Sequence, residues 1–276
     1  MRFTGITRSE EFRIVTRAHV IAWRTDLEHR EIGPRTNKRT PEGATIRHRL
    51  AALSSLFEYL CDQNAISHNP IKSVKRPKAD TGEGKTPALG DDHARQLLNT
   101  PGEQSIKDKR DRAILSTLLF HALRREELCK LKVKDFNQLR RGVPHLKIIG
   151  KGEKTRYLPL HPGTNTLIHD YLEAAGHSAD ENGALFRPIR NNRNGRLDQA
   201  ITPNGIYTLI RTYSAQLGFH IRPHALRATA ATNALDHQAD IAKVQEWLGH
   251  ANISTTRIYD HRKTRPEDSP TFKVHY

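Results

Sequence analysis

The segment Ala122-Leu123-Arg124-Arg125-Glu126-Glu127-Leu128 decides the fold, because it belongs to a set of four short segments spread along the chain. The other three are Gly150-Lys151-Gly152, His224-Ala225-Leu226-Arg227 and Leu248-Gly249-His250, and Tyr259 follows the last of them by nine residues. Each segment alone would occur by chance in many chains. The prediction therefore rests on finding all of them together, in this order.

Together these segments supply the side chains that exchange of phosphodiester bonds requires. Negative charge builds on the phosphate in the transition state, and Arg124 and Arg227 are permanently charged, forked donors suited to stabilising it. A phenol can store the phosphoryl group covalently, so the strand end is not lost to water. Lys151 can give a proton to the leaving oxygen, while His224 and His250 are candidates for proton transfer and for orienting the phosphate.

The order and local spacing of the segments resemble the catalytic domain of tyrosine recombinases, which include Xer-type recombinases and phage integrases. The family's motifs Ala/Gly-Leu-Arg-x-x-Glu-Leu, Gly-Lys-Gly, His-x-x-Arg and Leu-Gly-His match residues 122–128, 150–152, 224–227 and 248–250. The resemblance covers about Ala88 to Asp260, and more weakly the helix around Leu50 to Leu60. It implies that the catalytic residues are Arg124, Lys151, His224, Arg227, His250 and Tyr259, with Tyr259 as the nucleophile and His224 nearest the role of base.

The resemblance also implies an architecture and a reaction. The expected fold is mainly α with a small antiparallel β-sheet, arranged as a two-domain clamp of a helical core-binding domain and an α+β catalytic domain. The expected reaction is site-specific DNA recombination or integration through a 3′-phosphotyrosine intermediate. The expected partners are double-stranded DNA, three further copies in a homotetramer on two DNA sites, and accessory DNA-bending proteins. The tail from His261 to Tyr276 is expected to pass to a neighbouring copy.

Two positions depart from the family's pattern. Ala228-Thr229 follow Arg227 where the family commonly has histidine and then a small hydroxyl residue, and Arg125-Glu126 replace an apolar-small pair. Neither departure removes a catalytic group. We interpret Glu127 as a structural carboxylate that positions an arginine rather than as a catalyst.

Charge and composition agree with a nucleic-acid partner. The 276 residues include 45 Lys and Arg against 30 Asp and Glu, a formal net charge of +15. Such a chain usually meets a polyanion, with DNA or RNA the first candidate and an anionic membrane the second. The two cysteines give no disulfide framework, no apolar run reaches the roughly 18 residues of a membrane span, and Met1 to Glu10 lack a signal-peptide core. These features predict a cytoplasmic protein.

No cofactor is expected. The sequence has no Gly-x-x-x-x-Gly-Lys-Ser/Thr phosphate loop, and no Asp/Glu pair or His-x-x-x-His with metal-ligand spacing stands beside the four segments. Neither ATP nor a catalytic metal is therefore predicted.

Residues 1–77 are predicted to form the helical DNA-binding domain. One helix is expected from Thr16 to Arg30, and a second, opened by Thr40-Pro41, carries an apolar stripe from Ile46 to Leu60. Because only Met1 to Val15 precede the first of these, the domain is expected to lack the family's first helix. On the polar face of the second helix, Arg47 and Arg49 are predicted to contact phosphates.

A basic linker is predicted next. Residues 71–87 are rich in Lys, Pro and Gly with few apolar groups, and the linker proper is assigned to residues 78–87. Residues 88–276 are then the catalytic domain with its tail. The residues predicted to bind DNA around the linker are Lys72, Lys75 and Arg76, joined by Lys154 at the basic tip of a β-hairpin.

Within residues 88–276 the hydrophobic pattern predicts six helices and a two-stranded hairpin. The predicted helices are 91–99, 110–131, 166–175, 202–217, 224–235 and 240–248, and the two strands of the hairpin are 145–149 and 157–160. The polar loop at 187–196 carries four arginines. The other tyrosines, such as Tyr59, Tyr157 and Tyr171, are interpreted as packing residues.

Two alternatives to recombination stay open at the level of sequence. A type IB topoisomerase-like enzyme would use the same chemistry on one duplex, and a non-catalytic protein would bind DNA through charge alone. A covalent protein–DNA adduct would exclude the second alternative, and exchange between two sites would exclude the first.

Overall fold

A computed structural model describes residues 9–32, 40–77, 88–190, 195–260 and 271, apart from the side chains of Ser9, Glu10, Glu11 and Lys151. The chain divides into two compact units, Met1–Gly82 and Glu83–Tyr276, each with its own hydrophobic core. The predicted linker at 78–87, the tail at 261–276 except Thr271, and the centre of the arginine-rich loop at 191–194 lie outside the described residues.

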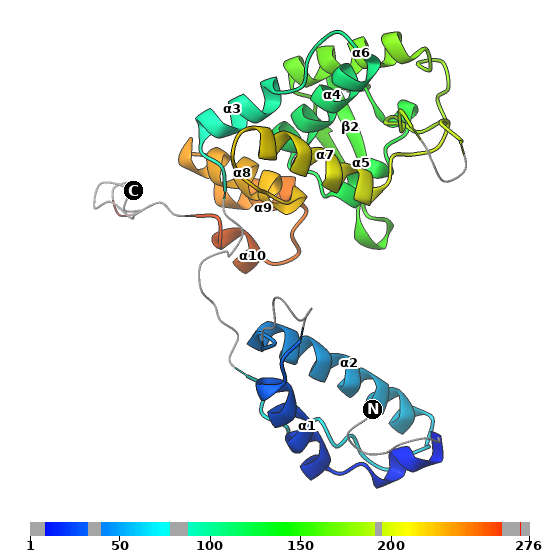
Figure 1. Cartoon of the computed structure of the whole chain (residues 1–276), viewed down its shortest axis with the longest axis vertical. Helices are drawn as coiled ribbons and strands as arrows, with labels where there is room; N and C mark the ends of the chain where they lie inside the picture. The colour runs from blue at the N-terminus through cyan, green and yellow to red at the C-terminus, as the bar shows by residue number, and fades with distance from the viewer. Residues whose placement is uncertain (1–8, 33–39, 78–87, 191–194, 261–270, 272–276) are drawn as a thin grey trace. The chain divides into compact units, whose positions relative to one another are not determined.

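The first unit is built on two packed helices (Figure 1). A 3-10 turn, Ser9–Ile14, precedes α1 (Arg17–His29), and α2 (Gly43–Asp62) follows. Thr16 caps α1 as predicted, since its side chain accepts a hydrogen bond from the amide of His19. The predicted start of α2 was wrong: Glu42, not Thr40, is its N-cap, so Pro41 lies before the helix.

The chain after α2 folds back onto that helix. The Asn69 side chain donates to the Ser54 carbonyl at 3.0 Å and to Glu58 at 2.8 Å, and accepts from the amide of Ile71 at 3.0 Å. As a result Ile71 and Val74 are buried in the unit's core. The prediction of a linker beginning at residue 71 was therefore wrong for these two residues, because apolar residues in a polar stretch can still fill a core.

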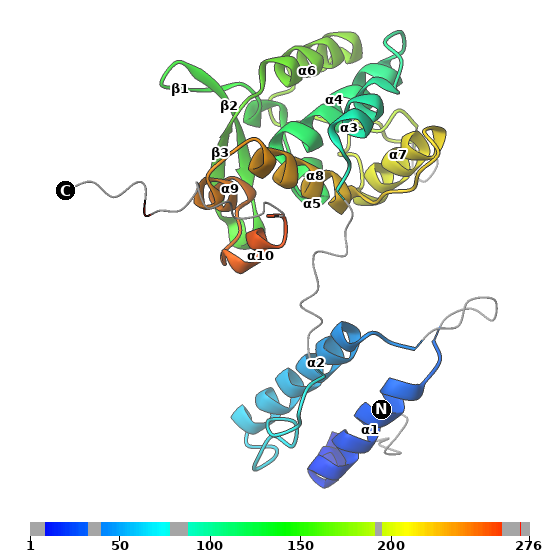
Figure 2. The same ribbon diagram turned by 90° about the vertical axis from the view of Figure 1, so that its left-hand side faces the viewer.

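The second unit contains eight α-helices among its described residues, drawn in Figures 1 and 2. Its elements are α3 (Asp91–Asn99), α4 (Ile106–His121), α5 (Arg125–Cys129), β1 (Gln138–Arg140), β2 (Val143–Ile149), β3 (Thr155–Pro159), α6 (Pro162–Ala175), α7 (Pro203–Gln216), α8 (Pro223–Asp236), α9 (Ile241–Leu248) and α10 (Ser254–Arg257). The buried helix α4 is the centre of the unit and packs against α3, α6 and α8. The expected mainly helical fold with a small antiparallel sheet is confirmed.

The helix predicted over 110–131 is instead two helices, and the break between them builds the site. Ala122 ends α4 in the left-handed conformation with φ 49°, and Arg124 is extended before α5 begins. Alanine favours helix and no glycine or proline marks the break, so periodicity alone could not find it. Tertiary bonds fix it: the Ala122 carbonyl accepts from the buried Arg227.

The sheet has three strands in the order β1-β2-β3, which Figure 2 shows side by side. The predicted hairpin is confirmed as β2 and β3, with Leu146 opposite Leu158 and both buried. The short strand β1 was not predicted. Its Leu139 is exposed, so the pattern of apolar residues gives no signal there.

The start of the second unit is bonded to α8. The amide of Leu89 donates to the Thr229 hydroxyl at 2.8 Å, and the Asn233 side chain donates to Asp91 at 2.6 Å. Thr229 belongs to the Ala228-Thr229 pair that follows Arg227, and its hydroxyl also donates to the Ala225 carbonyl at 2.8 Å. Thr229 thus holds Leu89 to α8, and Asn233 holds Asp91.

Within the described parts of the chain, no helix combines the length and the apolar character needed to cross a membrane.

Candidate active site

The break after α4 presents Arg124 at the first turn of α5. The Glu127 carboxylate accepts from the Arg124 amide and from its Nη1, each at 2.9 Å, which closes the first turn of α5. Glu127 is 5% exposed, whereas the Arg124 side chain is 37% exposed. The interpretation of Glu127 as a carboxylate that positions an arginine agrees with these bonds.

A second arginine, Arg156 on β3, contacts the same carboxylate. Its Nη1 and Nη2 donate to the two oxygens of Glu127 at 3.0 and 2.9 Å. Burial would raise the pKa of Glu127, but the hydrogen bonds and charges of Arg156 and Arg124 outweigh burial, and the pKa is lowered. The sequence analysis missed Arg156, because a single arginine in a strand belongs to none of the four segments.

Arg227 is held from inside the protein. Only 2% exposed, it donates through Nη1 to the Ala122 carbonyl and through Nη2 to the Leu248 carbonyl at 2.5 Å. Burial, reinforced by the charge of Arg124, lowers the pKa of Arg227 to about 10. The guanidinium remains charged at neutral pH, and its orientation is fixed by the end of α4 and the end of α9.

Tyr259 faces His224 across a short gap. The Tyr259 hydroxyl lies 3.4 Å from Nε2 of His224, which occupies the first turn of α8. Burial raises the pKa of Tyr259, and the charges of Arg227 and Arg124 partly offset that rise. Burial also lowers the pKa of His224, with Arg227 and Arg124 adding to the shift. At neutral pH the imidazole is therefore uncharged and able to accept a proton.

His250 also lies against Tyr259. Gly249 ends α9 with φ 66°, a conformation that suits glycine, and turns the chain so that the His250 and Tyr259 rings stack with centroids 6.3 Å apart. His250 Nδ1 is 3.0 Å from the Thr256 hydroxyl on α10. Burial, with the charges of Arg227 and Arg124, lowers the pKa of His250 to about 4.

Lys151 and Lys154 lie in the turn between β2 and β3. The turn is closed by a hydrogen bond of 2.8 Å from the Gly150 amide to the Lys154 carbonyl, and Gly152 has φ 69°. Lys154 is exposed. The side chain of Lys151 is outside what the structure describes, so its catalytic role stays a prediction.

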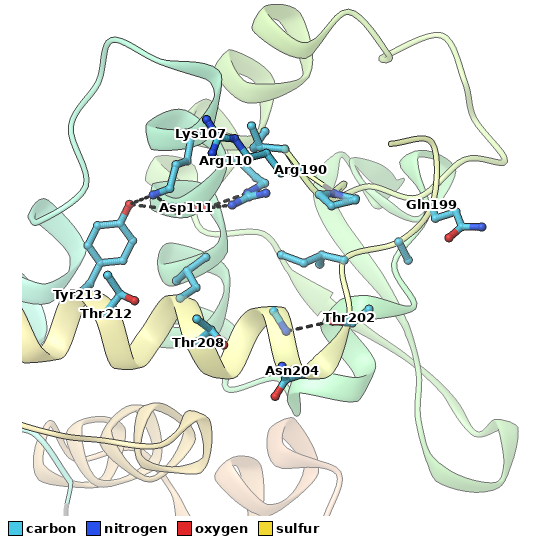
Figure 3. A pocket seen from close by; sticks show the side chains of 16 residues that line it. Lys107, Arg110, Asp111, Arg190, Gln199, Thr202, Asn204, Thr208, Thr212 and Tyr213 are labelled. Carbon is cyan, nitrogen blue, oxygen red and sulfur yellow. Dashed lines mark hydrogen bonds and ion pairs between the residues drawn. The ribbon is translucent and has the colours of Figure 1, made fainter. Parts of the chain in front are cut away.

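A cavity of about 480 Å³ opens beside these residues. Its walls include Arg124, His224 and Arg227, together with Tyr207 and Arg222, which the sequence analysis did not single out. A larger cavity of about 1010 Å³ lies elsewhere on the unit (Figure 3), where Lys107 and Tyr213 both bond to the buried Asp111. None of the predicted catalytic residues lines it.

The predicted DNA-binding residues of the first unit differ in how far they are accessible. Lys72, Lys75 and Arg76 are exposed, and Arg49 is half-buried. Arg47 is also half-buried, and its Nη1 donates to the Pro77 carbonyl at 3.0 Å. Arg47 therefore has a structural partner in the segment that follows α2.

Comparison with known proteins gives the class. The chain is 35% identical over 221 residues to tyrosine recombinase XerC of Herpetosiphon aurantiacus, an alignment covering 79% of this chain and 69% of that protein. It is 36% identical over 220 residues to tyrosine recombinase XerD of Listeria innocua serovar 6a, covering 77% and 69%. The fold and these relatives define a tyrosine-type site-specific recombinase.

Residues 88–265 match the model of the phage integrase family. The chain belongs to the phage integrase family. Among solved structures, its fold is similar to XerH site-specific recombinase bound to palindromic difH substrate, with a TM-score of 0.70, 23% identity and coverage of 94% of this chain and 72% of that one. It is also similar to a lambda integrase dimer bound to a COC' core site, with a TM-score of 0.65, 15% identity and coverage of 96% and 87%. The prediction of site-specific DNA recombination is confirmed, and the topoisomerase-like and non-catalytic alternatives are not favoured.

Proposed function

We propose that this recombinase cleaves and rejoins double-stranded DNA through a 3′-phosphotyrosine formed on Tyr259. The observation that carries the proposal is the position of the Tyr259 hydroxyl, 3.4 Å from His224 Nε2. Burial raises the pKa of Tyr259, and the charges of Arg227 and Arg124 offset part of that rise. A nucleophile beside a neutral base and cationic donors is the arrangement that covalent phosphoryl transfer needs.

In the first step the Tyr259 oxygen attacks the phosphorus and its proton passes to His224 Nε2. Arg124 and Arg227 stabilise the negative charge that builds on the non-bridging oxygens, with His250 assisting at the phosphate. The bond from phosphorus to the 5′ oxygen breaks, and Lys151 gives that oxygen its proton. Attack by the 5′ hydroxyl of the partner duplex reverses the sequence and releases Tyr259.

The remaining parts of the proposal concern DNA binding and assembly. The first unit and the segment 78–87 would contact the phosphate backbone of DNA. The side chains that would make these contacts are those of Arg49 and of the exposed Lys72, Lys75, Arg76 and Lys154. Arg47 would contribute less, since its guanidinium already binds Pro77. A homotetramer on two DNA sites, exchange of the tail from His261, and accessory DNA-bending proteins complete the proposal.

Cleavage of a nicked suicide substrate tests the function directly. We expect a covalent protein–DNA band in a denaturing gel, formed equally well in EDTA and without ATP, because the cations at the phosphate are arginine side chains. Peptide mapping of the adduct should identify Tyr259. Loss of the band on chelation, with recovery on adding magnesium, would contradict the assignment of Arg124 and Arg227 as the main phosphate clamp.

Lys151→Ala should slow cleavage by roughly a hundredfold or more, since the leaving oxygen loses its acid. A substrate with a 5′-bridging sulfur, which leaves without a proton, should restore most of the loss. Lys154→Ala is the comparison within the same turn, and we expect it to weaken DNA binding at low salt more than it slows cleavage. If the sulfur substrate restores nothing, Lys151 is not the general acid.

A further inference from the structure

We propose that Arg156 is a positioning residue that keeps Arg124 available for the scissile phosphate by occupying both oxygens of Glu127. The inference rests on the proposed function, because it assumes that Arg124 binds the phosphate. Arg156 lies on β3, outside the four sequence segments, and no role in the reaction follows from its sequence context.

Glu127 accepts as many hydrogen bonds as a carboxylate can. Its Oε1 accepts from Arg124 Nη1 and Arg156 Nη1, and its Oε2 accepts from the Arg124 amide and Arg156 Nη2. A carboxylate offers about four acceptor positions, so all are used. The contact of Arg156 with Glu127 is bidentate, whereas the contact of the Arg124 side chain is monodentate.

The Arg124 side chain has donors beyond the one that binds Glu127. Nη1 is engaged with Glu127, while the side chain is 37% exposed and lines the cavity beside His224 and Arg227. A guanidinium has five N–H donors. Arg124 therefore keeps donors for a phosphate as long as Nη1 is its only nitrogen bonded to Glu127. An arginine and a carboxylate prefer a bidentate pair when no other group occupies the carboxylate oxygens. Without Arg156, Arg124 would form that pair and turn from the cavity.

The net charge beside the phosphate also depends on Arg156. With both arginines in place, the Arg124–Glu127–Arg156 cluster carries a net positive charge, which favours a phosphate. Without Arg156 the remaining pair is neutral, and the buried carboxylate acts only on Arg124. Glu127 would then change from a residue that orients Arg124 into one that competes with the phosphate for it.

Packing shows that Arg156 is held firmly enough for this role. A Cβ placed on Gly249 would lie 3.4 Å from Cζ of Arg156, and one on Gly150 would lie 3.4 Å from its Nη1. The guanidinium thus fits closely between the turn that leads to His250 and the turn that carries Lys151. Its side chain is 18% exposed.

The test compares adduct formation by four proteins at a temperature where all are folded. Arg156→Ala should form adduct roughly a hundredfold more slowly than wild type, the effect of losing one aligned donor at the phosphate. The double variant Arg156→Ala with Glu127→Gln should recover roughly tenfold of that loss, because a neutral amide no longer captures Arg124. Arg156→Lys should fall between Arg156→Ala and wild type, since an ammonium cannot cover both carboxylate oxygens.

Arg110→Ala is the matched control for the loss of a buried arginine–carboxylate pair. Arg110 donates through Nε and Nη2 to Asp111 at 2.8 and 2.6 Å in the same unit, away from the site. Its removal should lower the melting temperature and leave the rate of adduct formation near that of wild type. A purely structural role for Arg156 predicts the same pattern for Arg156→Ala, with no rescue by Glu127→Gln.

Arg156→Lys takes the place of the double variant if that protein does not fold, because its ammonium still occupies part of the Glu127 carboxylate and its rate should exceed that of Arg156→Ala. A wild-type rate for Arg156→Ala, a double variant no faster than Arg156→Ala or, in its place, an Arg156→Lys variant no faster than Arg156→Ala overturns the inference. If wild type itself forms no adduct on Tyr259, the proposed function fails instead, so the two failures are distinguishable.

Discussion

Tyr259→Phe is expected to bind DNA with the affinity of wild type and to form no covalent adduct. The substitution removes one hydroxyl, whose contact with His224 at 3.4 Å is at the long end of hydrogen bonding, so the free energy of unfolding should change by less than about 1 kcal/mol. Binding depends on lysine and arginine contacts with phosphates, which the change leaves intact. The rate of adduct formation should fall below detection in a denaturing gel.

Tyr157→Phe is the matched control for this result. Tyr157 is on β3, 38% exposed, and stacks under Arg140 at 3.8 Å, a contact that phenylalanine also makes. We expect this variant to form adduct at the wild-type rate. Adduct formation by Tyr259→Phe would mean that another tyrosine is the nucleophile.

Arg227→Ala is expected to have the second large effect, on both catalysis and folding. Removing a fixed donor from the transferring phosphate should slow cleavage by about a thousandfold. The carbonyls of Ala122 and Leu248 would also lose their shared buried donor, which should lower the free energy of unfolding by on the order of 3 kcal/mol. Chemical denaturation and single-turnover cleavage measure the two effects separately.

Arg227→Lys separates the two roles. It keeps a positive charge, but one ammonium cannot reproduce a fork between the ends of α4 and α9, so cleavage should still fall about a hundredfold. Arg112→Ala, which removes a half-buried pair with the exposed Glu103 and a hydrogen bond of 3.3 Å to Asn99, should change the free energy of unfolding by about 1 kcal/mol. Near-normal cleavage by Arg227→Ala would show that Arg227 serves the fold alone.

The predictions from sequence succeeded where short-range chemistry decides the structure. Thr16 caps its helix as expected, and Thr202 and Asp240 cap theirs in the same way, since capping depends on a side chain and the amides two or three residues later. The β2–β3 hairpin was predicted from glycines and alternation around Lys151. Of the residues expected at the site, Tyr259 lies against His224 and His250.

The errors share a different cause, which is that long-range contacts override local pattern. The break at Ala122 depends on Arg227, a residue 105 positions later, so the segment itself contains no signal for it. Arg156 was missed because its partner, Glu127, is 29 positions earlier and the strand around it is ordinary. Tyr59 was expected to pack but is 59% exposed. The apolar stripe of a helix shows which face is buried, but it does not show how many of the flanking residues the neighbouring helix covers.

The bonds of Leu89 and Asp91 to α8 have a mechanical consequence. Thr229, which receives the Leu89 amide, is only two residues from Arg227 along the same helix. A force applied to the chain before Leu89 would therefore be transmitted to α8, the helix that carries His224 and Arg227. The hydroxyl of Thr229 is the anchor through which such a load would be transmitted.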